Sequence, residues 1–335
     1  MGPTIHDVAR LANTSKSTVS RFLNGRQVKK DTEEAIRKAV DELNFHRNAN
    51  ARRLVLDRTN LIAVVVNDIS NIFFSGVIRG IEQVANRKGY SCMFFSWASN
   101  AGNEISFLDL LYEDQVDGVI LVSFWKREPE ALRQIRESPY PVVLVGDNGE
   151  MDDILSVEVD HVSGAADIVR YLHGLGHRRI AYIAGPENLA ANRDRLKGYL
   201  QAMKALNIET NPDWTARSDW SNQGGYEAMK QLLERRGFTA VIASNDETAI
   251  GALRAAQENG VNVPKEMSIV GYDDITISDW VYPSLTTVRQ PFHEIGVRAA
   301  EGLFHKIDGT EDPSAVGRFL LKPKLIIRDS CGQRP

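Results

Sequence analysis

Five polar residues near the N-terminus recur at the spacing of one helix face. They are Lys16, Ser17, Ser20, Arg21 and Asn24. Lysine and arginine side chains donate hydrogen bonds to guanine O6 and N7, and hydroxyl and amide groups bind phosphate oxygens. A helix that presents such groups near its N-terminal end can read base edges in the major groove. An ordinary solvated helix has a similar face, so the surrounding elements must decide between the two interpretations.

The residues around this face predict a helix-turn-helix. Residues 4–12 carry apolar side chains at helical spacing, and Thr4 with Asp7 resembles a capping box in which Asp replaces Glu. After a two-residue break, Ser15 can cap a second helix over residues 16–24. Two short helices joined by a tight turn form a helix-turn-helix.

A third helix and the local charge support this interpretation. Residues 32–43 place Ile36, Ala39, Val40 and Leu43 at i, i+3, i+4 and i+7, which gives the first two helices an apolar cover. Residues 1–58 contain 12 Lys and Arg against 7 Asp and Glu, a net of +5, whereas residues 59–335 contain 28 against 37, a net of −9. The overall charge of −4 therefore hides a basic head that can approach phosphate.

The whole N-terminal motif resembles a known family. The run TIHDVARLANTSKSTVSRFLNG is similar to the DNA-binding headpiece of the LacI/GalR family of bacterial transcription regulators, and the match continues through Val28, Thr32 and LNFHRNANARRL. The resemblance implies base readout by Lys16, Ser17 and Arg21. Phosphate contacts are expected from Thr4, Thr18, Ser20, Asn24, Thr32 and Arg52.

The resemblance also implies a hinge helix after the headpiece. In the family, the segment matching residues 48–57 folds on operator binding, and one leucine from each subunit wedges into the minor groove. Leu54 stands at that position. Such a wedge unstacks a base step and kinks the duplex. The family usually has proline before the residue that matches Asn48, whereas this chain has Arg47. Two consequences of Arg47 at this position are considered: a looser start of the hinge and an added phosphate contact.

From residue 61 onward, short apolar runs alternate with amphipathic helical stretches. Strands are predicted at 61–66, 91–96, 118–124, 142–145, 179–184, 240–244 and 267–270, and helices at 75–88, 103–114, 162–175, 194–206, 224–235 and 247–259. Val/Ile/Leu-rich strands separated by helices indicate parallel α/β sheets. These units are too many for one ordinary open sheet, so two Rossmann-like lobes are expected.

The family resemblance extends over this region and so covers nearly the whole chain. It implies an α/β fold like that of a periplasmic binding protein, in which the chain crosses between two lobes three times. The expected organisation is a helix-turn-helix headpiece at 1–47, a hinge at 48–58 and an effector-binding domain at 59–335. The N-lobe is expected at about 60–160 and 291–319, and the C-lobe at about 161–290 and 320–330.

An effector is expected between the lobes, because ligands of open α/β sheets bind at the carboxyl ends of the strands. Candidates that follow strands, lie at a crossing or match family positions are Phe73, Phe74, Asp147, Arg195, Trp220, Asn245, Asp273 and Gln290. A carboxylate such as Asp273 can accept two sugar hydroxyls, and an aromatic face such as Trp220 can cover the C–H side of a sugar. Structural roles are open too: Asn245 and Asp246 as helix caps, Arg195 in an ion pair, and Phe74 or Trp220 in packing.

Other functional classes lack their motifs. No apolar run approaches the roughly 20 residues of a membrane helix, and no secretion signal is present, so a cytoplasmic protein without a membrane partner is expected. Cys92 and Cys331 are far apart and near no His cluster, which argues against a disulfide or a metal site. Neither a Walker A loop nor a GxSxG or HExxH motif occurs, and GLGHRR at 174–179 lacks the third glycine of a dinucleotide fingerprint. We therefore expect neither catalysis nor a cofactor.

The sequence thus predicts a homodimeric regulator, in the first instance a repressor, with a palindromic double-stranded DNA operator and a small-molecule effector. The effector is expected to be a sugar or sugar derivative. No heptad tail follows the last predicted elements, which favours a dimer over a tetramer. Two alternatives remain: a soluble carbohydrate-binding protein whose head no longer reads DNA, and a regulator with a purine or protein corepressor.

Overall fold

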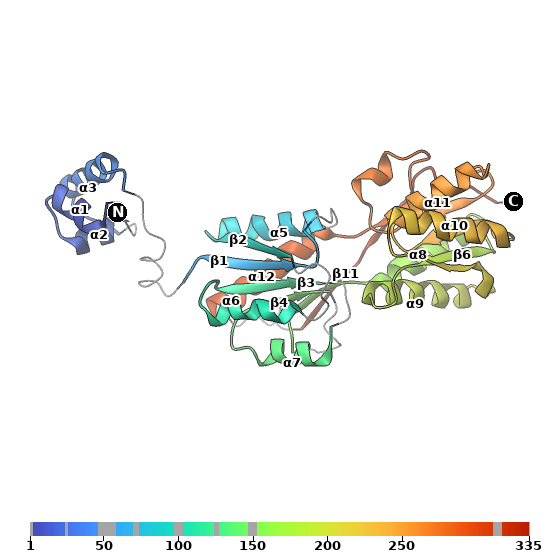
Figure 1. Cartoon of the computed structure of the whole chain (residues 1–335), viewed down its shortest axis with the longest axis horizontal. Helices are drawn as coiled ribbons and strands as arrows, with labels where there is room; N and C mark the ends of the chain where they lie inside the picture. The colour runs from blue at the N-terminus through green and yellow to red at the C-terminus, as the bar shows by residue number, and fades with distance from the viewer. Residues whose placement is uncertain are drawn as a thin grey trace. The chain divides into compact units, whose positions relative to one another are not determined.

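The computed structural model describes eight stretches of the chain: 3–23, 26–45, 58–69, 74–96, 103–123, 127–146, 153–310 and 317–334. They belong to two compact units, Met1–Thr59 and Asn60–Pro335 (Figure 1). All but the last residue of the predicted hinge lies outside the described stretches. Five predicted site residues and the departure at the proline position lie outside them too: Asn24, Arg47, Arg52, Leu54, Phe73 and Asp147.

Three helices form the described part of the first unit, as the sequence predicts. They are α1 (Ile5–Leu11), α2 (Lys16–Leu23) and α3 (Lys30–Glu42). Val8, Val19 and Ile36 meet in a small apolar core and have no exposed surface. The third helix begins two residues earlier than predicted, and Asp31 and Glu33 in its first turn stabilise the positive end of its dipole.

The predicted caps of the first two helices are confirmed. The backbone N–H of Thr4 donates to Asp7 Oδ2 at 2.9 Å, so Asp takes the part of Glu in the capping box. The backbone N–H of Thr18 donates to Ser15 Oγ at 3.1 Å. These bonds satisfy N–H groups that have no partner within the helix and fix where each helix begins.

A six-stranded parallel sheet forms the N-lobe of the second unit. Its order is β11 (Arg318–Leu321), β5 (Ser156–Val159), β4 (Val142–Val145), β3 (Gly118–Val122), β1 (Leu61–Val66) and β2 (Ser91–Ser96). Helices α5 (Phe74–Arg87) and α12 (Phe292–Asp308) pack on one face. The other face is covered by η1 (Asn103–Leu108), α6 (Asp109–Tyr112) and α7 (Pro129–Glu137). Cover on both faces explains the unbroken apolar runs of the central strands.

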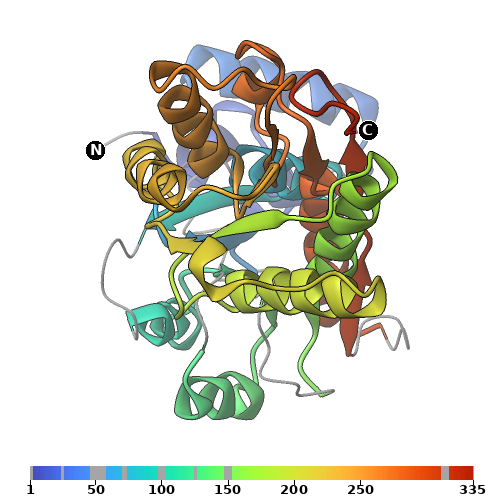
Figure 2. The same cartoon turned by 90° about the vertical axis from the view of Figure 1, so that its right-hand side faces the viewer.

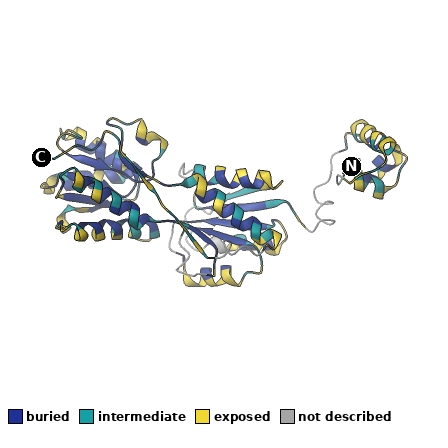
Figure 3. Ribbon diagram, turned by 180° about the vertical axis from the view of Figure 1, so that it is seen from behind, coloured by how far each residue is buried: buried dark blue, intermediate teal, exposed yellow. Residues whose placement is uncertain are grey.

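A four-stranded parallel sheet forms the C-lobe. Its order is β7 (Thr215–Arg217), β6 (Ile180–Ala184), β8 (Ala240–Ala243) and β9 (Ser268–Val270). Helices α8 (His161–Gly174) and α9 (Ala190–Ala205) lie on one side, and α10 (Asn222–Arg235) and α11 (Asp246–Glu258) on the other (Figure 2). In both lobes the central strands are buried, the edge strands β2, β7 and β11 are only partly buried, and the outer helix faces are exposed (Figure 3).

Three connections join the lobes. The first leads from β5 directly into α8, and the other two contain β10 (Thr287–Arg289) and β12 (Lys324–Ile326), which pair antiparallel. Because β11 pairs with β5, the N-lobe sheet extends to Leu321, two residues beyond the predicted limit. No helix within the described stretches is long and apolar enough to cross a membrane.

Some elements differ from the sequence prediction. The helix predicted at 103–114 is a 3-10 segment followed by the single turn of α6, and the helix predicted at 194–206 begins at Ala190. The sequence predicts no element at α7 or α12, or at the strands β5, β7, β10, β11 and β12. Strand β5 shows the reason: its sequence SVEV alternates polar and apolar residues as a strand does, but it is only four residues long, the shortest run in which such alternation indicates a strand.

Candidate functional site

The outer face of α2 presents the predicted base-reading residues. Lys16, Ser17 and Arg21 are exposed, while Val19 on the opposite face is fully buried. Within the described residues neither Lys16 nor Arg21 forms an ion pair, so both cations are available to an external anion. The first turn of α2 contains no acidic residue that would repel phosphate.

Two of the predicted phosphate-contacting hydroxyls already have hydrogen-bond partners within the headpiece. Thr4 is exposed, but its hydroxyl donates to Asp7 Oδ2 at 2.7 Å, so this bond must break before the hydroxyl can donate to phosphate. The Thr18 hydroxyl lies 2.7 Å from Ser15 Oγ. Ser20 and Thr32 are half-buried. Their roles, and those of Asn24, Arg52 and Leu54 outside the described residues, remain predictions.

Three of the predicted effector residues form one buried cluster in the C-lobe. Arg195 on α9 and Asp273 after β9 form an ion pair at 3.0 Å, and the Gln290 amide donates to the same Asp273 oxygen at 2.7 Å. Arg195 also donates to the carbonyl of Ser244. All three side chains are more than nine-tenths buried, yet Arg195 Nε and Gln290 Oε1 have no partner among the described residues. Buried unpaired polar atoms are costly unless a ligand or water completes them.

Trp220 and Asn245 adjoin this cluster. The indole N–H of Trp220 donates to Ser244 Oγ at 2.8 Å, and the Arg195 guanidinium lies 5.1 Å from the indole centre. Trp220 has a left-handed backbone conformation, with φ of 70°, and Asn245 stabilises it by donating to its carbonyl at 3.0 Å. Asn245 is also the N-cap of α11, so the capping role open at the sequence level is observed. The sequence therefore predicted a set of residues that the fold does bring together.

Burial governs the titration of the acidic groups in this part of the C-lobe. It raises the pKa of Asp273 to about 6, although the charge of Arg195 opposes the shift. It raises the pKa of Asp246 to about 7, with a further rise from the charge of Asp273. Asp246 accepts hydrogen bonds from the Ile275 N–H at 2.9 Å and from the hydroxyls of Ser278 and Thr287 at 2.7 and 2.5 Å. Asp246 thus joins α11, the segment after β9 and the crossing strand β10.

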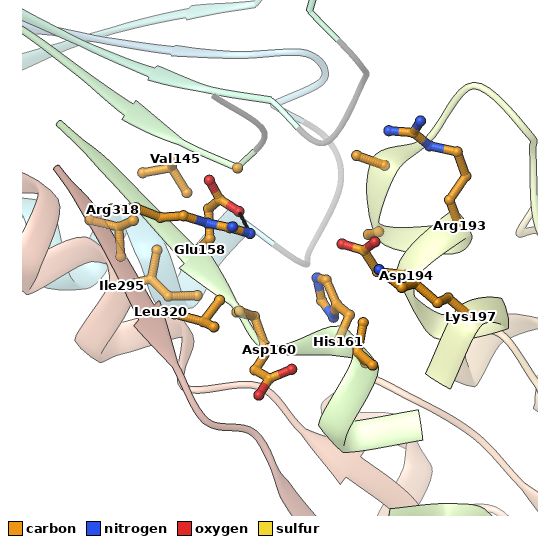
Figure 4. A pocket seen from close by; sticks show the side chains of 16 residues that line it. Val145, Glu158, Asp160, His161, Arg193, Asp194, Lys197, Ile295, Arg318 and Leu320 are labelled. Atoms are coloured by element: carbon orange, nitrogen blue, oxygen red, sulfur yellow. Dashed lines mark hydrogen bonds and ion pairs between the residues drawn. The ribbon is translucent and has the colours of Figure 1, made fainter. Parts of the chain in front are cut away.

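A cavity of about 490 Å³ lies between the two lobes (Figure 4). Its N-lobe side includes Val145, Val157, Glu158, Ile295, Arg318 and Leu320. Its C-lobe side includes His161, Ala190, Ala191, Arg193, Asp194 and Lys197. This size and this mixture of apolar walls and converging polar groups suit a small-molecule ligand.

The cavity connects to the Arg195 cluster through His161 and Tyr272. His161 Nδ1 lies 3.1 Å from the Tyr272 hydroxyl, and the Arg195 guanidinium lies 3.9 Å from the centre of the Tyr272 ring. Burial lowers the pKa of His161 well below its ordinary value, and the charge of Arg195 lowers it further, so the imidazole is neutral.

The described residues on the cavity surface itself are not among those predicted from the sequence. Among the described residues, the lining excludes Arg195, Trp220, Asn245, Asp273 and Gln290. Phe74, predicted to line the pocket, is 1% exposed and belongs to the N-lobe core, because α5 packs it against the sheet. A usable signal did exist: Asp160 and His161 stand at a strand-to-helix junction, but the preceding strand went unrecognised.

Comparison with known proteins agrees with this architecture. Residues 4–48 match the family of bacterial regulatory proteins of the lacI type, and residues 169–331 match a periplasmic binding protein-like domain. The chain is 35% identical to the HTH-type transcriptional repressor CytR of Escherichia coli strain K12 over 334 residues, which covers 99% of this chain and 97% of that protein.

Two solved structures extend the likeness to nearly the full chain. A lac repressor dimer bound to operator and the anti-inducer ONPF has a TM-score of 0.90 at 28% identity and covers 99% of this chain and 100% of that one. The transcriptional regulator CelR in complex with cellobiose has a TM-score of 0.74 at 31% identity, covering 98% and 99%. The chain belongs to the LacI family of bacterial regulatory proteins and is a DNA-binding transcriptional regulator, not an enzyme.

Proposed function

We propose that the chain is a homodimeric repressor of a palindromic operator, and that a small polyhydroxylated effector, a sugar or sugar derivative, controls its DNA binding from the space between the lobes. The exposed face of α2 carries this proposal. Lys16 and Arg21 project from it without an ion-pair partner in the described residues, above a core that fixes the helix. In this headpiece we assign Lys16, Ser17 and Arg21 to the base edges.

The effector half of the proposal rests on the inter-lobe cavity and the buried cluster beside it. Arg195 Nε can donate to a ligand oxygen, and Gln290 Oε1 can accept from a ligand hydroxyl. A hydroxyl-rich ligand supplies both kinds of group. The solved relative with cellobiose is a similar protein whose complex holds a sugar, which supports the same class here.

Dimerisation is proposed because one headpiece offers few contacts to DNA. Two linked heads on adjacent half-sites gain effective concentration, and a two-fold operator matches a two-fold protein. The lac repressor structure to which this chain is similar is a dimer bound to operator. Leu54 is the proposed minor-groove wedge of each subunit.

Operator selection tests the proposal. The full-length protein is used to select sites from a randomised palindromic library, and fluorescence anisotropy then gives the affinity for the selected site and its salt dependence. The triple variant Lys16→Ala, Ser17→Ala, Arg21→Ala should lose sequence preference. Lys38→Ala removes an exposed cation from α3 and is the matched control. If no site is enriched, or if the triple variant binds the selected site like the wild type, the repressor assignment fails.

The second candidate function is a carbohydrate-binding protein with an inactive head. Its supporting observation is the complete two-lobe fold with an enclosed polar cluster, which needs no DNA to bind a ligand. Ligand binding without any enriched operator would favour it. A regulator with a purine or protein corepressor is distinguished by operator binding that strengthens when that partner is added.

A further inference from the structure

The N-terminus of α9 forms part of the cavity wall and lacks a side-chain cap. This 16-residue helix starts after Leu189, which offers no capping side chain, and its first turn contains no acidic residue. Ala190 and Ala191 line the cavity, and their backbone N–H groups have no hydrogen-bond partner among the described residues. By contrast, Asp160, Ser221 and Asn245 cap α8, α10 and α11. Free N–H groups at a helix start, together with the helix dipole, attract anions.

His161 is a second, independent feature that points toward a ligand. Its side chain is more than nine-tenths buried and lines the cavity, and Figure 4 shows the imidazole directed into it. Nδ1 is hydrogen-bonded to the Tyr272 hydroxyl, whereas Nε2 has no partner among the described residues. When the Tyr272 hydroxyl donates to Nδ1, the proton of the neutral imidazole resides on Nε2, which then faces the cavity as a donor.

The charges around the cavity leave the α9 side positive. Arg193 and Lys197 are both exposed, are spaced i and i+4, and form no ion pair with a described residue. Asp194 lies between them in sequence, so these three side chains sum to +1.

The remaining carboxylates on the cavity are already engaged. Glu158 is paired with Arg318 at 2.6 Å on the N-lobe side. Asp160 accepts the Ser163 N–H at 2.9 Å as the cap of α8, and in Figure 4 it is directed away from α9. The donors at the start of α9 therefore face no unengaged carboxylate from the N-lobe side.

We propose that the effector carries one anionic group, a phosphate or a carboxylate, which the first N–H groups of α9, His161 Nε2–H and Arg193 hold together. This inference rests on the proposed function, since it names the ligand class of the same inter-lobe site. The hydroxyl-bearing part of the ligand extends toward the Arg195 cluster. Lys197 contributes its charge from the next turn of α9.

Matched ligand pairs test the proposal on the full-length protein. Thermal shift and calorimetry compare glucose with glucose 6-phosphate, ribose with ribose 5-phosphate, and glucose with glucuronate. The phosphate and carboxylate arms separate the two sources of negative charge. At least one anionic compound should bind about tenfold more tightly than its neutral parent, because a charge-assisted hydrogen bond contributes more than about 1.4 kcal/mol. The preference should weaken as salt is raised.

Two variants assign the preference to the proposed groups. Arg193→Gln removes an exposed cation without disturbing the core, and His161→Phe removes the buried donor. Each should reduce the ratio of anionic to neutral affinity within a pair by about tenfold. Lys204→Gln, an exposed lysine in the last turn of the same helix, is the matched control and should retain the full preference.

The outcomes separate this inference from the proposed function. Equal binding of neutral and anionic members, no binding of any anionic compound, or a full preference in both variants overturns the anion site. A neutral sugar that binds the wild type as tightly as its anionic counterpart, and does not bind Asp273→Asn, would leave the inter-lobe effector site in place while overturning the anionic group. Failure of operator enrichment bears on the repressor assignment and leaves the anion preference to be judged from the ligand pairs alone.

Discussion

The carboxyl group of Asp246 should make the stability of the second unit fall as pH rises. Burial raises its pKa from 3.8 to about 7, so the folded protein keeps a proton that the unfolded chain releases at lower pH. Between about pH 4 and pH 7 unfolding therefore releases a proton, and the free energy of unfolding decreases with pH across that window. Asn at this position cannot ionise, so Asp246→Asn removes this dependence.

The size of the effect follows from the two pKa values. Linkage between a folded pKa of about 7 and an unfolded pKa of 3.8 gives a loss of about 2.5 kcal/mol between pH 5 and pH 8. Asp246→Asn also disturbs three hydrogen bonds, at a cost of about 1–3 kcal/mol that does not vary with pH. The variant should therefore be less stable than the wild type at pH 5 and should recover about 2.5 kcal/mol relative to it by pH 8.

Urea denaturation followed by tryptophan fluorescence measures this difference. All five tryptophans lie beyond residue 59, so the signal reports the second unit alone. Glu209→Gln removes an exposed carboxylate in the same lobe and should give a curve parallel to that of the wild type. A difference between Asp246→Asn and wild type that stays constant within about 0.5 kcal/mol from pH 5 to pH 8 would refute the argument from burial.

Three further substitutions test other parts of the molecule. Arg21→Ala should weaken operator binding and relax the preference at one base pair by about 1–3 kcal/mol in competition anisotropy; an unchanged preference at every position would remove Arg21 from base readout. Asp273→Asn should leave operator affinity within about twofold while abolishing the response to effector, and a normal response would place the ligand elsewhere. Gly80→Ala should destabilise the N-lobe by about 1–3 kcal/mol in urea melts, because the new methyl group would overlap the His293 carbonyl where α5 crosses α12. A Gly80→Ala variant as stable as the wild type would show that the two helices can separate without cost.

The headpiece was predictable because its signals are local. Thr4 and Ser15 mark helix starts by capping, and Ile36 and Ala39 recur at helical spacing in a helix that closes the core. Every one of these relations joins residues within a few positions in sequence. The predicted helices therefore differ from the observed ones by at most two residues at the ends that the structure describes.

The lobes were predictable only where burial imposes an apolar run. Strands β1, β2 and β4 match their predicted limits. Helices pack against the sheet that contains these strands, so each strand is a short, mainly apolar segment bounded by polar residues. Strand β5 was missed, and with it the junction that places His161 in the cavity. The polar Glu158 in that strand is explained by its ion pair with Arg318 on β11, 160 residues later in the chain. The short alternation in SVEV is visible in the sequence, but the pairing with a strand 160 residues later is not.

The Arg195 cluster has properties that suit a binding site better than a stabilising core. A buried ion pair gains little over an apolar pair of the same shape, because removing both charges from water costs about as much as their attraction returns. Here the ion pair also leaves Arg195 Nε and Gln290 Oε1 unpaired in the described residues. If the proposed function is right, an effector forms hydrogen bonds with both atoms only in the lobe arrangement that brings both within reach of the ligand. Because Gln290 directly follows the crossing strand β10, the affinity for the effector depends on the position of that strand. The effector therefore shifts the equilibrium between two lobe arrangements by the difference between its binding free energies for them.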